Sequence, residues 1–341
     1  MDDKEVIAKT MDNFGISITS VKRYLQECVQ QEVIEITKEC ECGYRLMEQI
    51  HMSHIVLKEE VWNEDYIFNN HIARYLSGCN KEAFRIWQYT CEEMLNNALE
   101  HSQGQNVYIE VCTNALFSKV MVVDDGIGTF HTLVEYMKKS HWAKPQIEDA
   151  LVELYKGKFT SNAECHSGEG IFFTSKMVDD YILWSDNRMY LCGDGRECAS
   201  IQSHILSYAA RIGNIGTMVC MCLENETQRK IVEVFDMYTD IENGFIKTHI
   251  PVKEACITGE PVARSQARRI CNRLDEFKEV ILDFEKVEFI GQGFADEIFR
   301  VYALAHPNVI LHPVNMLPTV ERMVRHVGRG NLPENVRICE I

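Results

Sequence analysis

The spacing of hydrophobic residues near the start of the chain predicts two helices and a hairpin. Apolar residues recur at intervals of three and four positions behind Thr19 or Ser20, either of which is a candidate N-cap for the longer helix. These apolar positions are Val21, Tyr24, Leu25, Cys28 and Val29. A shorter helix precedes them and ends near Gly15, and alternating residues around Gly43 predict a β-hairpin. Residues 1–52 are therefore expected to form one small unit.

Residues 53–245 alternate helical stretches with apolar strands. Two of the strands, expected at residues 106–113 and 119–125, are separated only by the short turn NALFS, which requires them to be antiparallel. Residues 246–341 alternate strands and helices again and predict a compact α/β domain. The predicted fold class is α+β with three domains, at residues 1–52, 53–245 and 246–341.

Composition narrows the range of functions. The 341 residues carry a formal charge of −16, which argues against a protein that mainly coats nucleic acid or an anionic membrane. No run of about 18 apolar residues occurs, and the first residues lack the order of a signal peptide. We therefore expect a cytoplasmic protein without a membrane partner. The 14 scattered cysteines are expected to be small buried side chains.

The helical stretch EEMLNNALEHS at residues 92–102 carries an unusual polar face. Glu93, Asn97, Glu100 and His101 gather on one side, opposite an apolar side. A solvated helix face is the simpler interpretation. Asparagine, however, costs about half a kcal/mol relative to alanine inside a helix unless it is bonded. This cost favours a buried or ligand-facing role for Asn97.

Two glycine-containing motifs follow along the chain. In VMVVDDGIG, an apolar strand ends at Asp124 and runs into Gly126 and Gly128, so a carboxylate lies where the backbone can come close to a ligand. An ordinary strand-to-turn ending is the alternative. Further on, Gly168 and Gly170 open an amphipathic helix, whose N-terminus offers free N–H groups to phosphate.

Together with Gly216-Thr217 on the last apolar strand, these motifs resemble the GHKL ATP-binding family of gyrase, heat-shock chaperone, histidine kinase and MutL ATPases. The resemblance covers residues 55–225, and four motifs agree in order and spacing. It implies a Bergerat-type sandwich of helices on a mixed, mostly antiparallel sheet. It also implies ATP and Mg²⁺ as cofactors, and a mobile ATP lid between the second and third motifs.

The resemblance also implies roles for single residues. Asn97 would bind the Mg²⁺ that bridges the ATP phosphates. Asp124 would accept a hydrogen bond from the adenine amino group, and Thr217 would lie near the base. The glycines expected to shape the pocket or cradle phosphates are Gly126, Gly128, Gly168 and Gly170. Lys158 in the lid is a candidate phosphate contact, with a plain surface lysine as the alternative.

The residue type at the position of Glu93 differs between the branches of this family. Histidine kinases commonly have an amide at the position, whereas hydrolysing members and the serine kinases of the anti-sigma group have a glutamate that acts as general base. A carboxylate one helical turn before Asn97 can deprotonate a water or a serine hydroxyl. We therefore favour ATP hydrolysis or serine/threonine phosphorylation over histidine autophosphorylation.

The flanking parts resemble interaction modules. Residues 1–52 resemble a winged helix-turn-helix, in which Lys22, Arg23 and Gln26 would face DNA. Six Lys and Arg against ten Asp and Glu in this block count against DNA binding and leave protein docking or dimerisation open.

The C-terminal part resembles the STAS-like domains, relatives of anti-anti-sigma factors, through a strand closed by Asp283 and a helix that opens near Gly293-Phe294. The serine that accepts phosphate in those factors is replaced here by Gly291-Gln292-Gly293, so we do not expect this domain to be phosphorylated. The domain is expected to bind a protein partner.

The predicted function is a Mg-ATP-binding regulatory ATPase whose nucleotide state controls an interaction with DNA or a protein partner. One alternative is a serine/threonine protein kinase like the anti-sigma kinases. Another is an ATP-sensing transcription regulator without significant turnover. A homodimer is implied by family likeness only.

Overall fold

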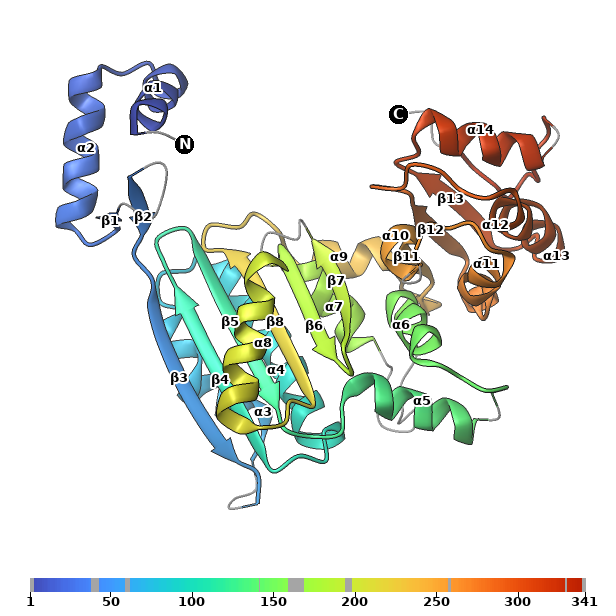
Figure 1. Ribbon diagram of the computed structural model, residues 1–341, viewed down its shortest axis with the longest axis horizontal. Coiled ribbons are helices and arrows are strands. Elements are labelled where there is room, and N and C mark those ends of the chain that lie inside the picture. Colours follow the sequence, from blue (N-terminus) through green and yellow to red (C-terminus); the bar gives the residue numbers. More distant parts are fainter. Residues whose placement is uncertain are drawn as a thin grey trace.

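The computed structural model describes residues 3–37, 43–58, 62–140, 142–158, 169–193, 198–256, 259–328 and 330–338. Figure 1 shows a small N-terminal unit, a central sheet covered by helices, and a C-terminal unit at the opposite end of the molecule. The arrangement is mixed α/β, as the hydrophobic patterns predict.

The N-terminal unit contains two helices and a hairpin. Helices α1 (Asp3–Phe14) and α2 (Ile18–Gln30) are followed by strands β1 (Ile34–Ile36) and β2 (Tyr44–Leu46), which pair antiparallel. Ser17, rather than Thr19 or Ser20, is the N-cap of α2, because its hydroxyl accepts a hydrogen bond from the Ser20 N–H at 3.2 Å. The predicted order of helix, helix and hairpin is confirmed.

The central sheet has six strands in the order β3-β4-β5-β8-β6-β7, and every neighbouring pair is antiparallel. The strands are β3 (Gln49–Val56), β4 (Asn106–Thr113), β5 (Phe117–Asp124), β6 (Asp180–Ser185), β7 (Arg188–Gly193) and β8 (Thr217–Glu224). The predicted antiparallel pairing is confirmed. Strand β3 lies across the predicted division between residues 52 and 53, because its pairing with β4 begins at Gln49.

Helices cover both faces of this sheet (Figure 1). The side chains of its strands alternate between the two cores with a period of two. On one face lie α3 (Glu64–His71), α4 (Lys81–His101), α7 (Gly170–Met177) and α9 (Ile231–Tyr238), with a 3-10 turn at Ala73–Tyr75. On the other face, α8 (Cys198–Ile212) packs on a smaller core. Its Tyr208 hydroxyl donates to the Glu110 carboxylate at 3.1 Å. Helix α8 is absent from the elements that the sequence patterns predict.

Two helices and two short strands connect the central sheet to the C-terminal unit. The helices are α5 (Thr129–Lys139) and α6 (Ile147–Lys156), and the strands β9 (Thr239–Asp240) and β10 (Gly244–Phe245) pair antiparallel. Helix α6 follows the central motif with Asp124 in the sequence but contacts strand β11 of the C-terminal unit. It therefore joins the two parts.

The C-terminal unit is a parallel sheet of three strands, β11 (Lys247–Pro251), β12 (Glu279–Asp283) and β13 (Ile310–Val314), in that order. Its helices are α10 (Val252–Ala255), α11 (Arg264–Cys271), α12 (Gln292–Asp296), α13 (Ala303–Ala305) and α14 (Pro318–Val327), with a 3-10 turn at Leu274–Glu276 and a π-helical stretch at Glu297–Tyr302. The alternation predicted for residues 246–341 is confirmed.

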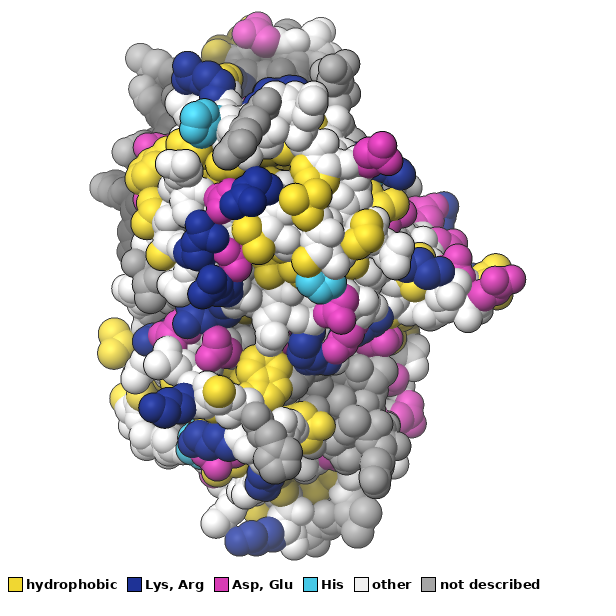
Figure 2. All heavy atoms as spheres, turned by 90° about the vertical axis from the view of Figure 1, so that its right-hand side faces the viewer, with side chains coloured by type: hydrophobic (Ala, Val, Ile, Leu, Met, Phe, Trp, Pro, Cys, Tyr) yellow, Lys and Arg dark blue, Asp and Glu magenta, His cyan; other side chains and the backbone are white. Residues whose placement is uncertain are grey.

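The outer face of the C-terminal unit carries mixed charge. Figure 2 views this side and shows Lys and Arg side chains with Asp and Glu side chains between them. Within this unit, ion pairs join α11 to the helix that follows β12: Arg264 with Asp296 at 2.9 Å, and Arg268 with Glu297 at 2.9 Å. One face of α11 is thus fixed within its own unit.

A cluster of aromatic rings connects the central and C-terminal parts. Phe172 of α7 packs edge-on against Tyr238 of α9, with ring centroids 5.0 Å apart, and lies 4.8 Å from Phe245. Phe245 in turn meets Phe277, just before β12, at 5.4 Å. Phe172 is fully buried, so its area is removed from water at the junction of the two parts.

We predict that Phe172→Ala destabilises the protein by about 3–5 kcal/mol, because truncation of a buried phenylalanine loses its transfer free energy and leaves a cavity. Phe289→Ala is the matched control, since Phe289 is 49% exposed and its truncation leaves no comparable cavity. Urea unfolding followed by circular dichroism measures both. Equal midpoints for the two variants would contradict the junction described here.

Candidate functional site

Asp124 organises one end of the central sheet. It is the last residue of β5, pairs with Thr217, the first residue of β8, and is only 5% exposed. Its Oδ1 atom accepts hydrogen bonds from the backbone N–H of Gly126 at 2.9 Å and of Thr217 at 3.2 Å. One buried carboxylate thus ties the end of β5 to the start of β8.

Glycines allow three backbone segments to come together around this carboxylate. A Cβ atom at Gly126 would collide with the carbonyl oxygen of Ser102, and one at Gly216 would lie 2.6 Å from the Gly126 backbone. Gly128 has a φ of 91°, and a Cβ atom there would lie 2.7 Å from Asp186 Oδ2. The residues Gly126, Gly128 and Thr217 that the sequence singles out therefore lie together with Asp124.

The adjacent carboxyl groups of Asp124 and Asp125 have pKa values displaced in opposite directions. Burial raises the pKa of Asp124 to about 6, against the lowering effect of the Gly126 and Thr217 N–H groups. Burial also acts to raise the pKa of Asp125, but hydrogen bonds from Asn106 and Gln105 outweigh it and the pKa is lowered. These donors lie 2.7 to 2.9 Å from the Asp125 oxygens.

Helix α4 forms a wall beside this end of the sheet. The carbonyl oxygen of Ser102, just after the helix, accepts from the Ile127 N–H at 2.9 Å, so the helix terminus touches the Asp124 turn. Asn97 lies five residues before Ser102, and Glu93 one turn earlier, at about 1.5 Å of rise per residue. Both are half-buried, and Asn97 makes no side-chain hydrogen bond within the described part of the chain. Its amide can therefore bind a ligand without breaking an existing bond.

Glu93 meets the start of α7. A Cβ atom at Gly170, the first residue of α7, would collide with Glu93 Oε2. Burial, together with the carboxylates of Glu93 and Glu169, raises the pKa of Tyr89. Gly168 lies outside the described residues. Glu93 and Gly170, far apart in the sequence, are thus brought into contact.

Lys158 is bound to the C-terminal unit. Its ammonium donates to the Glu276 carbonyl oxygen at 2.8 Å and lies 4.5 Å from the centre of the Phe277 ring. Burial lowers its pKa, and the charges of Glu276 and Glu169 act in the opposite direction. The ammonium is thus held against the C-terminal unit, and its contact with phosphate stays a prediction.

Four further residues shape the site and were not predicted: Thr129, Ser185, Asp186 and Asn214. The Thr129 and Thr217 hydroxyls lie 2.9 Å apart, and Ser185 Oγ donates to the Gly216 carbonyl at 2.8 Å. Asn214 Nδ2 donates to the Asp125 carbonyl at 3.1 Å. The only signal in the sequence was the Asp186-Asn187 turn. Ser185 and Asp186 reach the site because Ser185 pairs with Thr217, and sequence patterns did not predict this pairing.

Asn97 is the candidate metal ligand of this site. Within the described ranges, no three His, Cys, Asp or Glu side chains form a group that could hold a metal ion. By the resemblance, Mg²⁺ would combine the Asn97 amide with phosphate oxygens and water, a common arrangement for this hard cation. The glycines around Asp124 are packed against Ser102, Asp186 and neighbouring backbone.

The DNA-contact candidates lie on α2. Lys22, Arg23 and Gln26 are all exposed, and Arg23 is within 3.6 Å of Glu27 on the same helix. They lie on a different unit from Asp124. Their contact with DNA stays a prediction.

Comparison with known proteins supports the C-terminal assignment. Residues 266–321 match the family described as STAS-like domain of unknown function (DUF4325). The predicted STAS-like resemblance is confirmed for these residues, which run from α11 into α14. A search of curated proteins found no match to the chain. In the described ranges, no helix is both long and apolar enough to cross a membrane.

We predict that Asp124→Asn stabilises the ligand-free protein at pH 8. The pKa of Asp124 is raised from 3.8 to about 6, so between these pH values the folded state binds more protons than the unfolded state. The free energy of unfolding of the native protein therefore falls as pH rises through this range. The interval corresponds to about 3 kcal/mol at most. Urea unfolding at pH 4 and pH 8 should show a smaller loss of stability across this range in Asp124→Asn.

Asp125→Asn is the matched control with the opposite sign. The lowered pKa means that Asp125 contributes stability above pH 4, which is lost on acidification, and its replacement should destabilise the protein at pH 8. If the two variants shift stability in the same direction, the assignment of the buried charge to Asp124 is wrong.

Proposed function

We propose that the chain binds Mg-ATP at the Asp124 end of the central sheet and hydrolyses it slowly, and that nucleotide state controls how the flanking units meet a protein partner or DNA. The observation that carries the proposal is the convergence of motifs that are far apart in the sequence. Gly126 and Gly216 pack around Asp124, the Ser102 end of α4 touches the same turn, and Gly170 meets Glu93.

Each residue has a role that its surroundings support. A carboxylate with a pKa of about 6 is an anion at pH 7.5, so Asp124 can accept a hydrogen bond from the adenine amino group. Bound Mg²⁺ would neutralise charge on the phosphates, and the Asn97 amide oxygen would hold it. Glu93, one turn before Asn97, would take a proton from the attacking water. Nearby, the N-terminus of α7 can donate N–H groups to phosphate.

The surrounding units favour a regulatory role. The STAS-like domain at residues 266–321 belongs to a class that commonly binds proteins, and it contacts α6, which lies between two of the nucleotide motifs. A nucleotide-dependent change near Asp124 could therefore reach a surface that meets a partner. This arrangement supports a switch rather than an enzyme of intermediary metabolism.

A serine/threonine protein kinase is the second candidate. The STAS-like match favours it, because relatives of this domain act beside kinases of the anti-sigma group. Glu93 would then deprotonate a serine hydroxyl instead of water. The substrate would be a separate protein, since Gly291-Gln292-Gly293 offers no hydroxyl in this chain's own domain.

We predict that Asn97→Ala abolishes Mg-dependent ATP binding, because it removes the amide oxygen that holds the metal. Glu93→Gln should keep binding but lower turnover by about 10²–10⁴-fold, the usual contribution of a general base. Binding is measured with a fluorescent ATP analogue, and turnover by phosphate release.

Neighbours on the same helix provide matched controls. Asn96→Ala and Glu92→Gln change the same chemical groups about 100° around α4 and should leave binding and turnover close to wild type. Full turnover in Glu93→Gln would refute its role as base. Loss of binding in Asn96→Ala to the same degree as in Asn97→Ala would refute a specific role for Asn97.

The two candidate reactions differ in where the γ-phosphate goes. With γ-labelled ATP and a co-encoded protein, the ATPase proposal predicts that label is released as free phosphate at the same rate whether or not the protein is present. Stable transfer of label to a serine of that protein would instead establish the kinase and overturn hydrolysis as the main reaction.

A further inference from the structure

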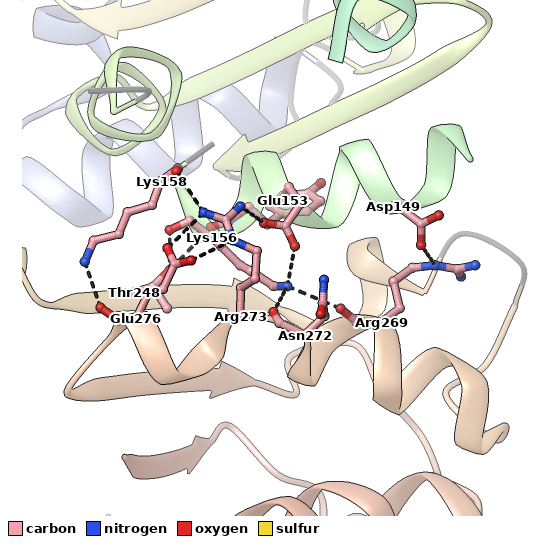
Figure 3. A network of polar contacts seen from close by, with 10 residues as sticks. Asp149, Glu153, Lys156, Lys158, Thr248, Arg269, Asn272, Arg273 and Glu276 are labelled. Carbon is pink, nitrogen blue, oxygen red and sulfur yellow. Dashed lines mark hydrogen bonds and ion pairs between the residues drawn. The ribbon is translucent and has the colours of Figure 1, made fainter. Parts of the chain in front are cut away.

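Helix α6 is held against the C-terminal unit by a buried polar network (Figure 3). The Lys156 side chain at the end of α6 is 1% exposed. Its ammonium donates to Glu153 Oε1 at 2.6 Å, to the Arg269 carbonyl at 3.2 Å and to the Asn272 carbonyl. Two of these acceptors belong to the C-terminal unit, so the lysine is satisfied only while α6 is docked.

Polar residues of α6, of α11 and of the turn after α11 together form what we call the α6 network (Figure 3). They are Asp149, Glu153 and Lys156 of α6, Arg269 of α11, and Asn272 and Arg273 of the turn. Arg273 Nη1 contacts Glu153 Oε2 at 2.8 Å, and Arg269 Nε contacts Asp149 Oδ1 at 2.7 Å. Glu153 is 3% exposed. Loss of one partner of a buried ion pair leaves the other charge buried and unpaired, which is strongly unfavourable. The contacts of Glu153 and Lys156 are therefore expected to form or break together.

The docked α6 touches the nucleotide site through α7. Gly157 closes α6, and a Cβ atom there would lie 2.6 Å from the Phe172 ring of α7. Helix α7 begins at Gly170, which meets Glu93. The far end of α7 is also tied to the C-terminal sheet, since Lys176 Nζ lies 3.2 Å from His249 Nδ1. Helix α7 is thus linked to the C-terminal unit through α6 near its start and through Lys176 at its end.

The same docking occupies Lys158. Its ammonium is bonded to the Glu276 carbonyl at 2.8 Å, two residues after α6 ends. This bond uses one of the three N–H donors of the ammonium and holds the group against the C-terminal unit. The docked arrangement therefore withholds one basic group from the proposed nucleotide site.

We propose that the STAS-like unit acts as a built-in inhibitor of nucleotide binding, by holding α6 and Lys158 through the α6 network. The inference rests on the proposed Mg-ATP binding and names its regulation. Coupling between two sites is reciprocal, so bound nucleotide weakens the docking of the STAS-like unit by the same factor that docking weakens nucleotide binding. A protein partner that binds Arg269 of α11 and Arg273 in the turn after it would release α6 in the same way.

Adjacent arginines on α11 provide the test. Arg269 pairs with Asp149 of α6, whereas Arg268 pairs with Glu297 inside the STAS-like unit. In the full chain, Arg269→Gln should lower the Kd of a fluorescent, non-hydrolysable ATP analogue with Mg²⁺ by about fivefold or more, a typical allosteric coupling. Arg268→Gln should leave the Kd within about twofold of wild type, as expected of a site without shared partners.

Arg273→Gln combined with Arg269→Gln should lower the Kd further, because it also removes the ion pair between Arg273 and Glu153. If circular dichroism shows that this double variant does not fold, the comparison of Arg269→Gln with Arg268→Gln stands, since both leave the buried Lys156–Glu153 pair intact.

The possible failures are distinguishable. If wild type binds the analogue and Arg269→Gln has the same Kd as Arg268→Gln, or a higher one, inhibition by the α6 network is overturned while the proposed function stands. If wild type binds no analogue at any concentration, the proposed function fails and the regulation fails with it.

Discussion

The close approach of backbone around the buried Asp124 carboxylate is the constraint on which the rest of the structure depends. Two N–H groups, from Gly126 and Thr217, hold one carboxylate oxygen, and Gly216 leaves room for the turn to press against it. A side chain larger than hydrogen at Gly126 would meet the Ser102 carbonyl, so the end of α4 and the end of β5 could not touch. Burial raises the pKa of this carboxyl to about 6, so its charged form lowers stability, and groups with such shifted pKa values cluster at functional sites.

From this end of the sheet, a series of contacts extends to the C-terminal unit. Helix α4 runs away from Asp124 and carries Asn97 and then Glu93, which meets the first residue of α7. Helix α7 in turn packs against α6, and polar contacts of Lys156, Asp149 and Glu153 fix α6 to α11 and to the turn after it. Helix α11 uses different arginines on its two sides, with Arg268 turned to its own unit and Arg269 to α6. The molecule thus contains a continuous path of packed side chains from the candidate nucleotide site to the STAS-like unit.

The sequence predicted local features well and spatial ones poorly, for physical reasons. Strand patterns and turn glycines are local, so the antiparallel sheet, the Asp124 turn and the alternation of strands and helices in the C-terminal domain could be predicted. The partners of Lys158 could not, because its contact with Glu276 joins residues 118 positions apart. Helix α8 was missed because it covers a second sheet face that strand patterns do not reveal, and Ser185 was missed because its role depends on strand order. Strand β3 begins at Gln49, before the predicted division between residues 52 and 53, because the N-terminal hairpin runs almost directly into this strand.

Hydrogen–deuterium exchange of the full wild-type chain, with and without Mg²⁺ and a non-hydrolysable ATP analogue, tests nucleotide binding around Asp124. Binding there should slow exchange in peptides that cover residues 93–104, 124–130 and 214–219, because these segments meet around Asp124 and would contact the ligand. Helix α2 and strand β13 should not change. Unchanged exchange in all three segments at saturating analogue, or protection confined to parts distant from Asp124, would contradict binding there.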